Sequence, residues 1–170
     1  RGATAPAPSI PRQPVHTVYG GAHLFRAELA AKLGNLARRS LQEYAPDPEQ
    51  FAEAFGVARD LAPRVRERVL DKLAREPVED LRIDFEDGFG PRPDDEEDRV
   101  AHAAAQELAK GHKLGALPPF IGLRIKPLTP DLAPRALRTL ELFLTTMAEQ
   151  AERTLPPWFV VTLPKVTRPQ

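Results

Sequence analysis

The chain has 170 residues and a mass of 18.8 kDa, enough for one domain with a core of its own. Its 24 basic and 24 acidic side chains cancel, so the chain lacks the overall positive charge that holds a nucleic acid. No apolar run approaches the roughly 20 residues that span a membrane, and the absence of cysteine excludes disulfides and thiolate chemistry. Without a secretory signal, we expect a soluble, cytoplasmic protein that binds neither nucleic acid nor membranes.

The N-terminal segment differs in composition from the rest of the chain. Residues 1–14 are rich in Ala, Pro and Ser and contain almost no large apolar side chain, which predicts a disordered tail. The chain opens at Arg1 and its single methionine is Met147, so we expect a processed, trimmed or partial chain. Residues 15–170 are expected to form one domain.

Beyond this tail, strand-like and helix-like patterns alternate. Short β-branched, alternating or continuous apolar runs predict strands over 15–19, 81–86, 120–126 and 158–163. Apolar residues at helical spacing, separated by prolines, predict helices over 22–44, 48–57, 63–75, 95–110 and 134–153. The last strand is almost entirely apolar, which predicts burial on both faces, and Trp158 is expected in the core.

This alternation predicts an α/β fold with a parallel sheet, strand order 1-2-3-4 and helices on the outer face. A closed (β/α)₈ TIM barrel needs about 250 residues, whereas this chain supplies four strands of that type. We therefore expect the N-terminal half of such a barrel. The alternative is a complete, open, doubly wound sheet, but its glycine fingerprint is missing.

Charged residues alternate with apolar ones along two of the predicted strands. Arg82, Asp84 and Glu86 occupy one strand, and Arg124 and Lys126 the next. Because both faces of a parallel sheet are covered, such charges must be paired, hydrated or used, and this favours a functional site over a structural ion-pair network. Catalytic groups of parallel barrels lie at the carboxyl ends of the strands, the position predicted for Glu86, Asp87, Arg124, Lys126 and Lys165.

Three other features have simpler structural interpretations. The acidic run Asp94–Asp98 begins a predicted helix, where the helix dipole stabilises negative charge. The pair Gly20-Gly21 indicates a tight turn, with an anion-binding set of backbone N–H groups as the alternative. The four histidines lack close metal-ligand spacing, and His16 is the best outside candidate among them.

The predicted strand ends resemble a known family. The segments Ile83-Asp84-Phe85-Glu86-Asp87, Leu123-Arg124-Ile125 and Leu163-Pro164-Lys165-Val166 resemble the HpcH/HpaI aldolase and citrate lyase β-subunit family, in order and in spacing. The opening segment from His16 to Phe25 is similar to an uncharacterised bacterial branch described as aldolase/citrate-lyase-like. The resemblance covers about residues 14–168.

This resemblance implies a (β/α)₈ barrel of the phosphoenolpyruvate/pyruvate superfamily and a homo-oligomer. It implies a metal-dependent carbon–carbon lyase, using Mg²⁺ or another divalent metal, that acts on a 2-oxo acid or an acyl-CoA thioester through an enolate. The alternative is a non-catalytic binding or structural domain with a buried ion-pair network.

The resemblance also implies roles for individual residues. Arg124 would contact substrate oxygens, with Glu86 as its expected resting partner, and Glu86 and Asp87 would lie near the metal and its waters. Together with Lys126 and the Gly20-Gly21 pair, which are suggested by the strand pattern and by the anion-binding alternative described above, Arg124 and Lys165 make up the expected substrate-binding set. The family's direct metal ligands come from later strands, so these residues alone are expected to be inactive. Two departures from the family pattern predict a reshaped rim: Gly88-Phe89-Gly90 and Lys126-Pro127.

Overall fold

The computed structural model describes residues 12–167. A four-stranded sheet forms its centre, and all neighbouring strands are parallel, in the order β1-β2-β3-β4. This confirms the predicted α/β class, direction and strand order. The strands are β1 (Thr17–Gly21), β2 (Asp80–Asp84), β3 (Phe120–Arg124) and β4 (Phe159–Thr162).

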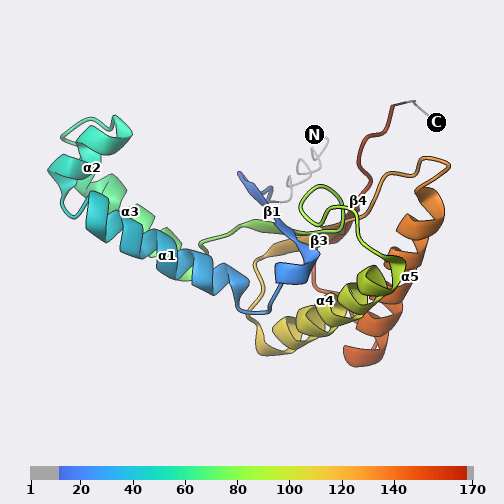
Figure 1. Cartoon of the computed structure of the whole chain (residues 1–170). Helices are drawn as coiled ribbons and strands as arrows, with labels where there is room; N and C mark the ends of the chain where they lie inside the picture. The colour runs from blue at the N-terminus through green and yellow to red at the C-terminus, as the bar shows by residue number, and fades with distance from the viewer. Residues whose placement is uncertain (1–11, 168–170) are drawn as a thin grey trace, which may run out of the picture.

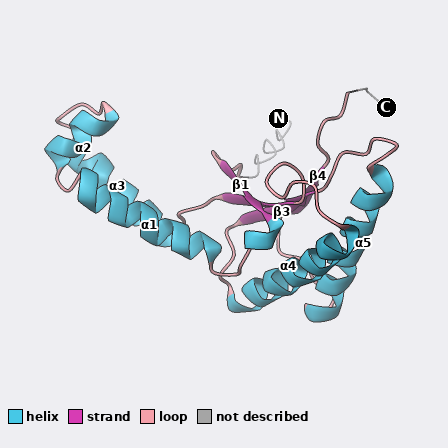
Figure 2. Ribbon diagram, in the orientation of Figure 1, coloured by secondary structure: helices cyan, strands magenta, loops and turns pink. Residues whose placement is uncertain are grey.

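The helices divide into two groups (Figures 1 and 2). Helices α4 and α5 pack against each other and cover one face of the sheet, whereas α1, α2 and α3 form an arm that projects away from it. A short 3₁₀ helix follows β1. The helical bounds are η1 (Ala22–Leu24), α1 (Leu29–Tyr44), α2 (Pro48–Phe55), α3 (Ala62–Arg75), α4 (Asp94–Leu114) and α5 (Ala133–Gln150).

The two faces of the sheet differ in chemistry. Leu81, Ile83, Ile121 and Leu123 are at most 1% exposed and pack with side chains of α4 and α5, such as Leu108 and Phe143, in the main core. The alternate positions of the same strands point to the opposite face. The register aligns them in rows, of which the last contains Gly21, Asp84, Arg124 and Thr162.

Three sequence predictions are wrong in detail. The expected helix over 22–44 is interrupted after η1, and α1 begins only at Leu29. Strand β1 begins at Thr17 and includes both glycines, so Gly20-Gly21 belongs to the strand and not to a tight turn after it. Strand β4 is not buried on both faces: Val160 is 40% exposed, and Trp158, expected in the core, is 60% exposed. Val160 pairs with Gly122 on the face of the sheet that α4 and α5 do not cover, and Trp158 precedes the strand and packs against the Phe120 ring.

Most of the predicted disordered tail, residues 1–11, lies outside the described residues. Where the described chain starts, Arg12 forms an ion pair with Glu76, next to the end of α3. The guanidinium of Arg12 and the ammonium of Lys72 lower the pKa of Glu76 to about 2. Residues 12–14 are therefore tied to the body of the protein.

Candidate functional site at the carboxyl ends of the strands

The centre of the site is a two-point ion pair between neighbouring strands. Asp84 ends β2 and Arg124 ends β3, and the parallel register places them side by side. Arg124 donates from Nε to Asp84 Oδ1 at 2.8 Å and from Nη2 to Oδ2 at 2.6 Å. This bidentate arrangement fixes the plane of the guanidinium.

Asp84 also organises the loop that follows β2. Its carboxylate accepts hydrogen bonds from the backbone N–H groups of Glu86 at 2.9 Å and Gly88 at 2.7 Å. Burial acts to raise the pKa of Asp84, but the Arg124 guanidinium and these two N–H groups outweigh burial and hold that pKa below its usual value. Asp84 is therefore a buried, ionised anchor for both Arg124 and the loop.

Two more carboxylates and a lysine complete the group. Arg124 Nη1 lies 3.2 Å from Glu86 Oε2 and 3.5 Å from Asp87 Oδ2. Lys165, which follows β4, places Nζ 2.6 Å from Glu86 Oε1 and 3.1 Å from Asp87 Oδ1. We call Asp84, Glu86, Asp87, Arg124 and Lys165 the rim cluster. It brings together four of the predicted site residues and adds Asp84.

The backbone and an aromatic ring also shape this cluster. Lys165 has a φ of 53°, in the left-handed region that a non-glycine residue enters at a cost. The Arg124 guanidinium carbon lies 4.6 Å from the centre of the Tyr19 ring, within cation–π distance. Tyr19 is 45% exposed, so the face of the guanidinium that stacks on its ring lies on the side of the sheet that α4 and α5 leave uncovered.

The two glycines of β1 have separate environments. A β-carbon at Gly21 would lie 2.3 Å from the carbonyl oxygen of Gly88, so the absence of a side chain lets the loop after β2 approach β1. A β-carbon at Gly20 would meet only Leu29, at 4.0 Å. Gly21 thus supports the rim cluster through backbone packing, and Gly20 lies on the other face.

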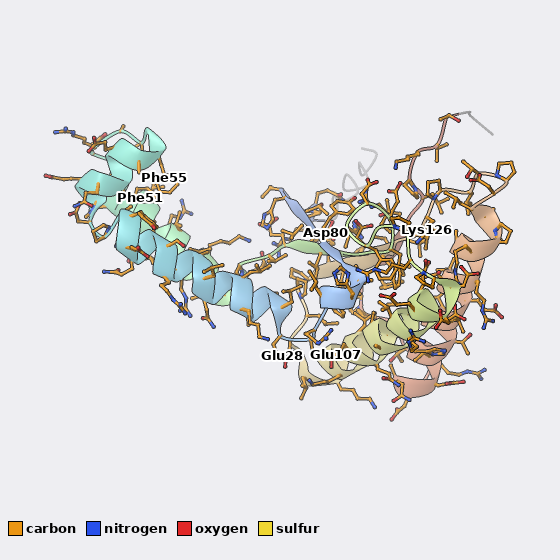
Figure 3. The ribbon with its side chains drawn as sticks, viewed as in Figure 1. Glu28, Phe51, Phe55, Asp80, Glu107 and Lys126 are labelled. Atoms are coloured by element: carbon orange, nitrogen blue, oxygen red, sulfur yellow. The ribbon has the colours of Figure 1, made fainter. Side chains whose placement is uncertain are left out.

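Lys126 is separate from the rim cluster, although the sequence places it on the same alternating face as Arg124. Strand β3 ends at Arg124, and the chain then directs Lys126 toward α4 (Figure 3). Its Nζ donates to Glu97 Oε2 at 2.6 Å and to the carbonyl oxygen of Phe85 at 3.0 Å. Glu97 is fully buried and also accepts a hydrogen bond from Thr139 at 2.5 Å. Lys126 therefore neutralises a buried carboxylate between α4 and α5.

The acidic run has structural partners, in agreement with its interpretation from the sequence. It occupies the first turns of α4, and Glu97 binds Lys126 while Asp98 binds Arg135. His16, the outside candidate, accepts a hydrogen bond on Nε2 from the backbone N–H of Glu79 at 3.2 Å. Over residues 12–167, no group of three or more His, Asp or Glu side chains is arranged to hold a metal ion.

A second ion pair lies one layer below the rim cluster on the same face. Asp80, at the start of β2, accepts hydrogen bonds from Thr17 Oγ1 at 2.9 Å and from Arg82 Nη2 at 2.8 Å. The Arg82 side chain passes over Gly122, its neighbour on β3 in the register. A β-carbon at position 122 would lie 2.6 Å from Arg82 Nη1, so only glycine leaves room for the guanidinium there. Polar side chains thus continue down the open face of the sheet.

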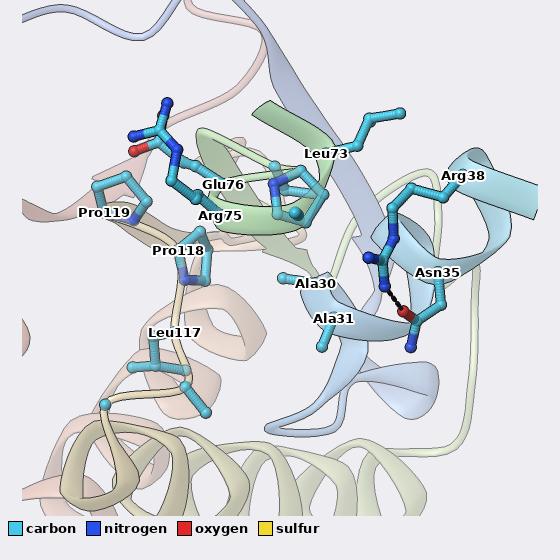
Figure 4. Close-up of a pocket in the computed structure, with 15 residues that line it drawn as sticks. Ala30, Ala31, Asn35, Arg38, Leu73, Arg75, Glu76, Leu117, Pro118 and Pro119 are labelled. Carbon is cyan, nitrogen blue, oxygen red and sulfur yellow. Dashed lines mark hydrogen bonds between the residues drawn. The ribbon is translucent and has the colours of Figure 1, made fainter. Parts of the chain in front are cut away.

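A cavity of about 370 Å³ lies at the opposite ends of the strands (Figure 4). It is enclosed by the base of the arm, the residues before β2 and the loop before β3. Its lining contains none of the rim cluster and includes Ala30, Asn35, Arg38, Arg75 and Pro118.

Comparison with known proteins identifies the family. A family model described as a domain of unknown function (DUF6986) matches residues 3–170, and the chain belongs to this family. No curated protein and no solved structure gives a significant match. Among the helices of the described region, none combines the length and the apolar character needed to cross a membrane.

Proposed function

We propose that this member of the DUF6986 family is a carbon–carbon lyase of the aldolase or citrate-lyase type, acting on a 2-oxo acid or an acyl-CoA thioester. The described strands would form one side of a (β/α)₈ barrel, with the face that carries Tyr19, Asp84 and Arg124 turned inward. Four parallel strands in sequential order, with helices on one face and charges at the carboxyl ends, support this arrangement. The resemblance of the strand-end motifs to the aldolase and citrate lyase family supports the reaction class.

The observation on which the proposal rests is the way Arg124 is held. Asp84 binds the Nε and Nη2 edge of the guanidinium, so Nη1 is left to meet Glu86 and Asp87. Cleavage of the carbon–carbon bond would leave an enolate, and its oxygen or the adjacent carboxylate can replace these carboxylates as the acceptor at Nη1. A guanidinium held rigidly in place stabilises the negative charge that develops on the enolate oxygen in the transition state. This lowers the activation barrier for cleavage, because the side chain does not have to move during the reaction.

Lys165 would supply a second positive charge at the same place. Its ammonium contacts Glu86 and Asp87, and these contacts raise its pKa, so it stays protonated. A charged amine of this kind binds anionic oxygens and does not act as a nucleophile. The proposal therefore assigns substrate binding to Lys165, alongside Arg124.

The metal ion that the proposal implies does not fit a direct site among the described residues. Glu86 and Asp87 offer carboxylate oxygens, which Mg²⁺ prefers, but the third carboxylate of the cluster, Asp84, is held by Arg124 and two backbone N–H groups, and no set of three acidic or histidine side chains within residues 12–167 is arranged to hold a metal ion. Both carboxylates also already contact Arg124 and Lys165. Glu86 and Asp87 are accordingly assigned to water-mediated contact with a metal, and direct ligands are not assigned to this region.

One observation favours the second candidate, a non-catalytic domain with a structural ion-pair network. Each charged side chain of the rim cluster already contacts one of opposite charge. The two candidates differ in what an anionic ligand does. A catalytic cluster exchanges these contacts for ligand contacts, whereas a structural network keeps them.

The test measures lyase activity and ligand binding in the protein at its full natural length. Cleavage of 2-oxo acid aldols and of 3-hydroxyacyl-CoA thioesters is followed with Mg²⁺, and binding of oxalate, a stable enolate mimic, is measured by calorimetry. We expect cleavage in one substrate class, with oxalate binding lost in Arg124→Met and retained in Arg99→Met, a matched change at an exposed arginine of α4. Absence of both cleavage and oxalate binding would overturn the proposal.

A further inference from the structure

The arm, residues 29–75, has little core of its own. Apart from Ala30, which belongs to the main core, its buried apolar side chains form a separate cluster of five, Leu41, Ala45, Phe51, Ala52 and Ala62, with partly buried side chains such as Val65 and Leu70 packed against it. Most of the stability of a helix in a protein comes from packing of its apolar face, and a core this small supplies little of it. The arm is therefore a thin element whose apolar core is small compared with the main core.

Apolar surface is exposed on the arm in a continuous region. Tyr44, the last residue of α1, is 72% exposed. Phe55, the last residue of α2, is 62% exposed and lies near the far end of the arm (Figure 3). Between them and α3 lies an apolar hollow of about 360 Å³. We call it the arm hollow; its lining includes Ala37, Tyr44, Ala54, Phe55, Val69 and Leu73. Exposed apolar patches of this kind mark protein interfaces.

Charge is divided along the arm. Around the tip, residues 46–61, acidic side chains outnumber basic ones, and Glu49 and Glu53 form no ion pair within residues 12–167. Along the stems of α1 and α3 basic side chains predominate, among them Arg38 and Arg68, which likewise form no ion pair in the described chain. The far end of the arm thus carries a net negative charge, and the stems formed by α1 and α3 carry a net positive charge.

We propose that the arm is a homodimer interface, in which the arms of two copies pack antiparallel about a two-fold axis that passes near the arm hollow. An interface between identical surfaces must be self-complementary. In the antiparallel arrangement the acidic tip of each copy meets the basic stems of the other, while Tyr44 and Phe55 of each copy cover the hollow of its partner. Parallel packing would place like charges together, which opposes association.

The first experiment measures self-association by sedimentation velocity over a range of concentrations. We expect a reversible dimer in the wild type and a dissociation constant raised about tenfold or more by Phe55→Glu, as for an exposed aromatic anchor. Leu137→Glu is the matched control, since Leu137 is 55% exposed on α5, away from the arm. Circular dichroism verifies that the helices of each variant are retained.

The second experiment identifies the partner as a copy of the same chain. The double change Glu49→Arg with Glu53→Arg is expected to weaken the dimer, and adding Arg38→Glu with Arg68→Glu is expected to restore it. The quadruple variant has a basic tip and acidic stem positions, so its tip is attracted to the stems of another copy of the same variant. A different partner protein would keep its original charges and would not regain its binding. Changing Glu141 and Glu149, exposed residues of α5, to Arg is the matched control.

The third experiment uses the absence of cysteine from the chain. A single Ala54→Cys, on the lining of the arm hollow, is expected to form a disulfide-linked dimer under mild oxidation, whereas Glu149→Cys is not. A protein that stays monomeric at all concentrations would overturn the proposal. So would association unaffected by Phe55→Glu, or a dimer that shows neither charge rescue nor the Ala54→Cys crosslink.

Discussion

Asp84 and Arg124 lie side by side on neighbouring parallel strands and share two parallel hydrogen bonds, of 2.8 and 2.6 Å. Asp84 is 1% exposed, so its charge depends on this partner. The same carboxylate holds the backbone of Glu86 and Gly88. One ion pair therefore orients the guanidinium and fixes the loop that carries the other acidic members of the rim cluster.

The first prediction concerns Arg124→Lys. Lysine retains a positive charge next to Asp84 but makes one contact where arginine makes two, so it cannot hold an orientation toward a ligand. We expect the fold to survive with a modest fall in melting temperature, and turnover to fall by about 100-fold or more, as when one oxyanion donor is removed. Thermal melting and steady-state kinetics of the variant are measured together.

Arg99→Lys provides the control for this change, because Arg99 is an exposed arginine paired with Asp95 on α4. We expect Arg99→Lys to change neither the melting temperature nor the turnover rate. A large fall in melting temperature for Arg124→Lys with unchanged kinetics would assign Arg124 to a structural network.

The second prediction separates Lys126 from the site. Lys126→Met removes the ammonium that neutralises Glu97, which is fully buried. Breaking a buried ion pair typically costs about 3–5 kcal/mol of unfolding free energy, but Arg135, with Nε 3.6 Å from Glu97 Oε1, remains as a second cation. We expect a loss at or below the lower end of that range in urea denaturation, with oxalate affinity unchanged in the folded protein. Adding Glu97→Leu is expected to recover part of the loss, and a weaker oxalate affinity in Lys126→Met would place Lys126 in the site after all.

The third prediction compares two adjacent glycines. Gly21→Ala would place a β-carbon 2.3 Å from the carbonyl oxygen of Gly88, and backbone at that distance must move. We expect a loss of about 1–3 kcal/mol, typical of overpacking, and displacement of the loop that carries Glu86 and Asp87. Gly20→Ala meets only Leu29 at 4.0 Å, so it is the matched control and should be tolerated. Equal effects of both changes on denaturation midpoints would contradict this account.

Periodicity predicted most of the fold because it reports which face of each element is buried. The change from helical to alternating spacing near Leu81 located β2, and the alternation of strands with helices implied the parallel order. Element ends were less accurate. The helix expected from Ala22 breaks before Leu29, where the chain leaves the sheet, and such a break depends on tertiary packing that spacing does not report.

The site was predicted only in part, for a similar reason. Residues at strand ends could be named from the sequence, and the structure brings Glu86, Asp87, Arg124 and Lys165 together. The pairing of Arg124 with Asp84 depends on the register between β2 and β3, which no local pattern contains. The alternating pattern of charged and apolar residues predicted that Lys126 would lie on the same face as Arg124. Strand β3 ends at Arg124, however, so the alternation no longer determines where the Lys126 side chain points.

The last prediction concerns pH, and its sign follows from the pKa of Asp84. Arg124 and two backbone N–H groups hold this pKa below its ordinary value of 3.8 in the folded protein, against the opposing effect of burial. The folded state therefore binds a proton at Asp84 less readily than the unfolded state does. The resulting stabilisation is complete at pH values well above 3.8, and it is lost as the pH falls through the lower pKa of the folded state.

Asp84→Asn tests this dependence, because asparagine keeps the shape of the side chain without the charge. At pH 7 we expect the variant to lose about 3–5 kcal/mol of unfolding free energy, since Arg124 is left without its main partner. As the pH falls from 3.8 through the lower pKa of the folded state, Asp84 of the wild type becomes protonated and the difference between the two proteins should shrink. Urea denaturation at a series of pH values from 7 to 2 measures this difference. A constant difference over that range would mean that Asp84 stabilises the fold through its shape and hydrogen bonds, and that its charge contributes nothing.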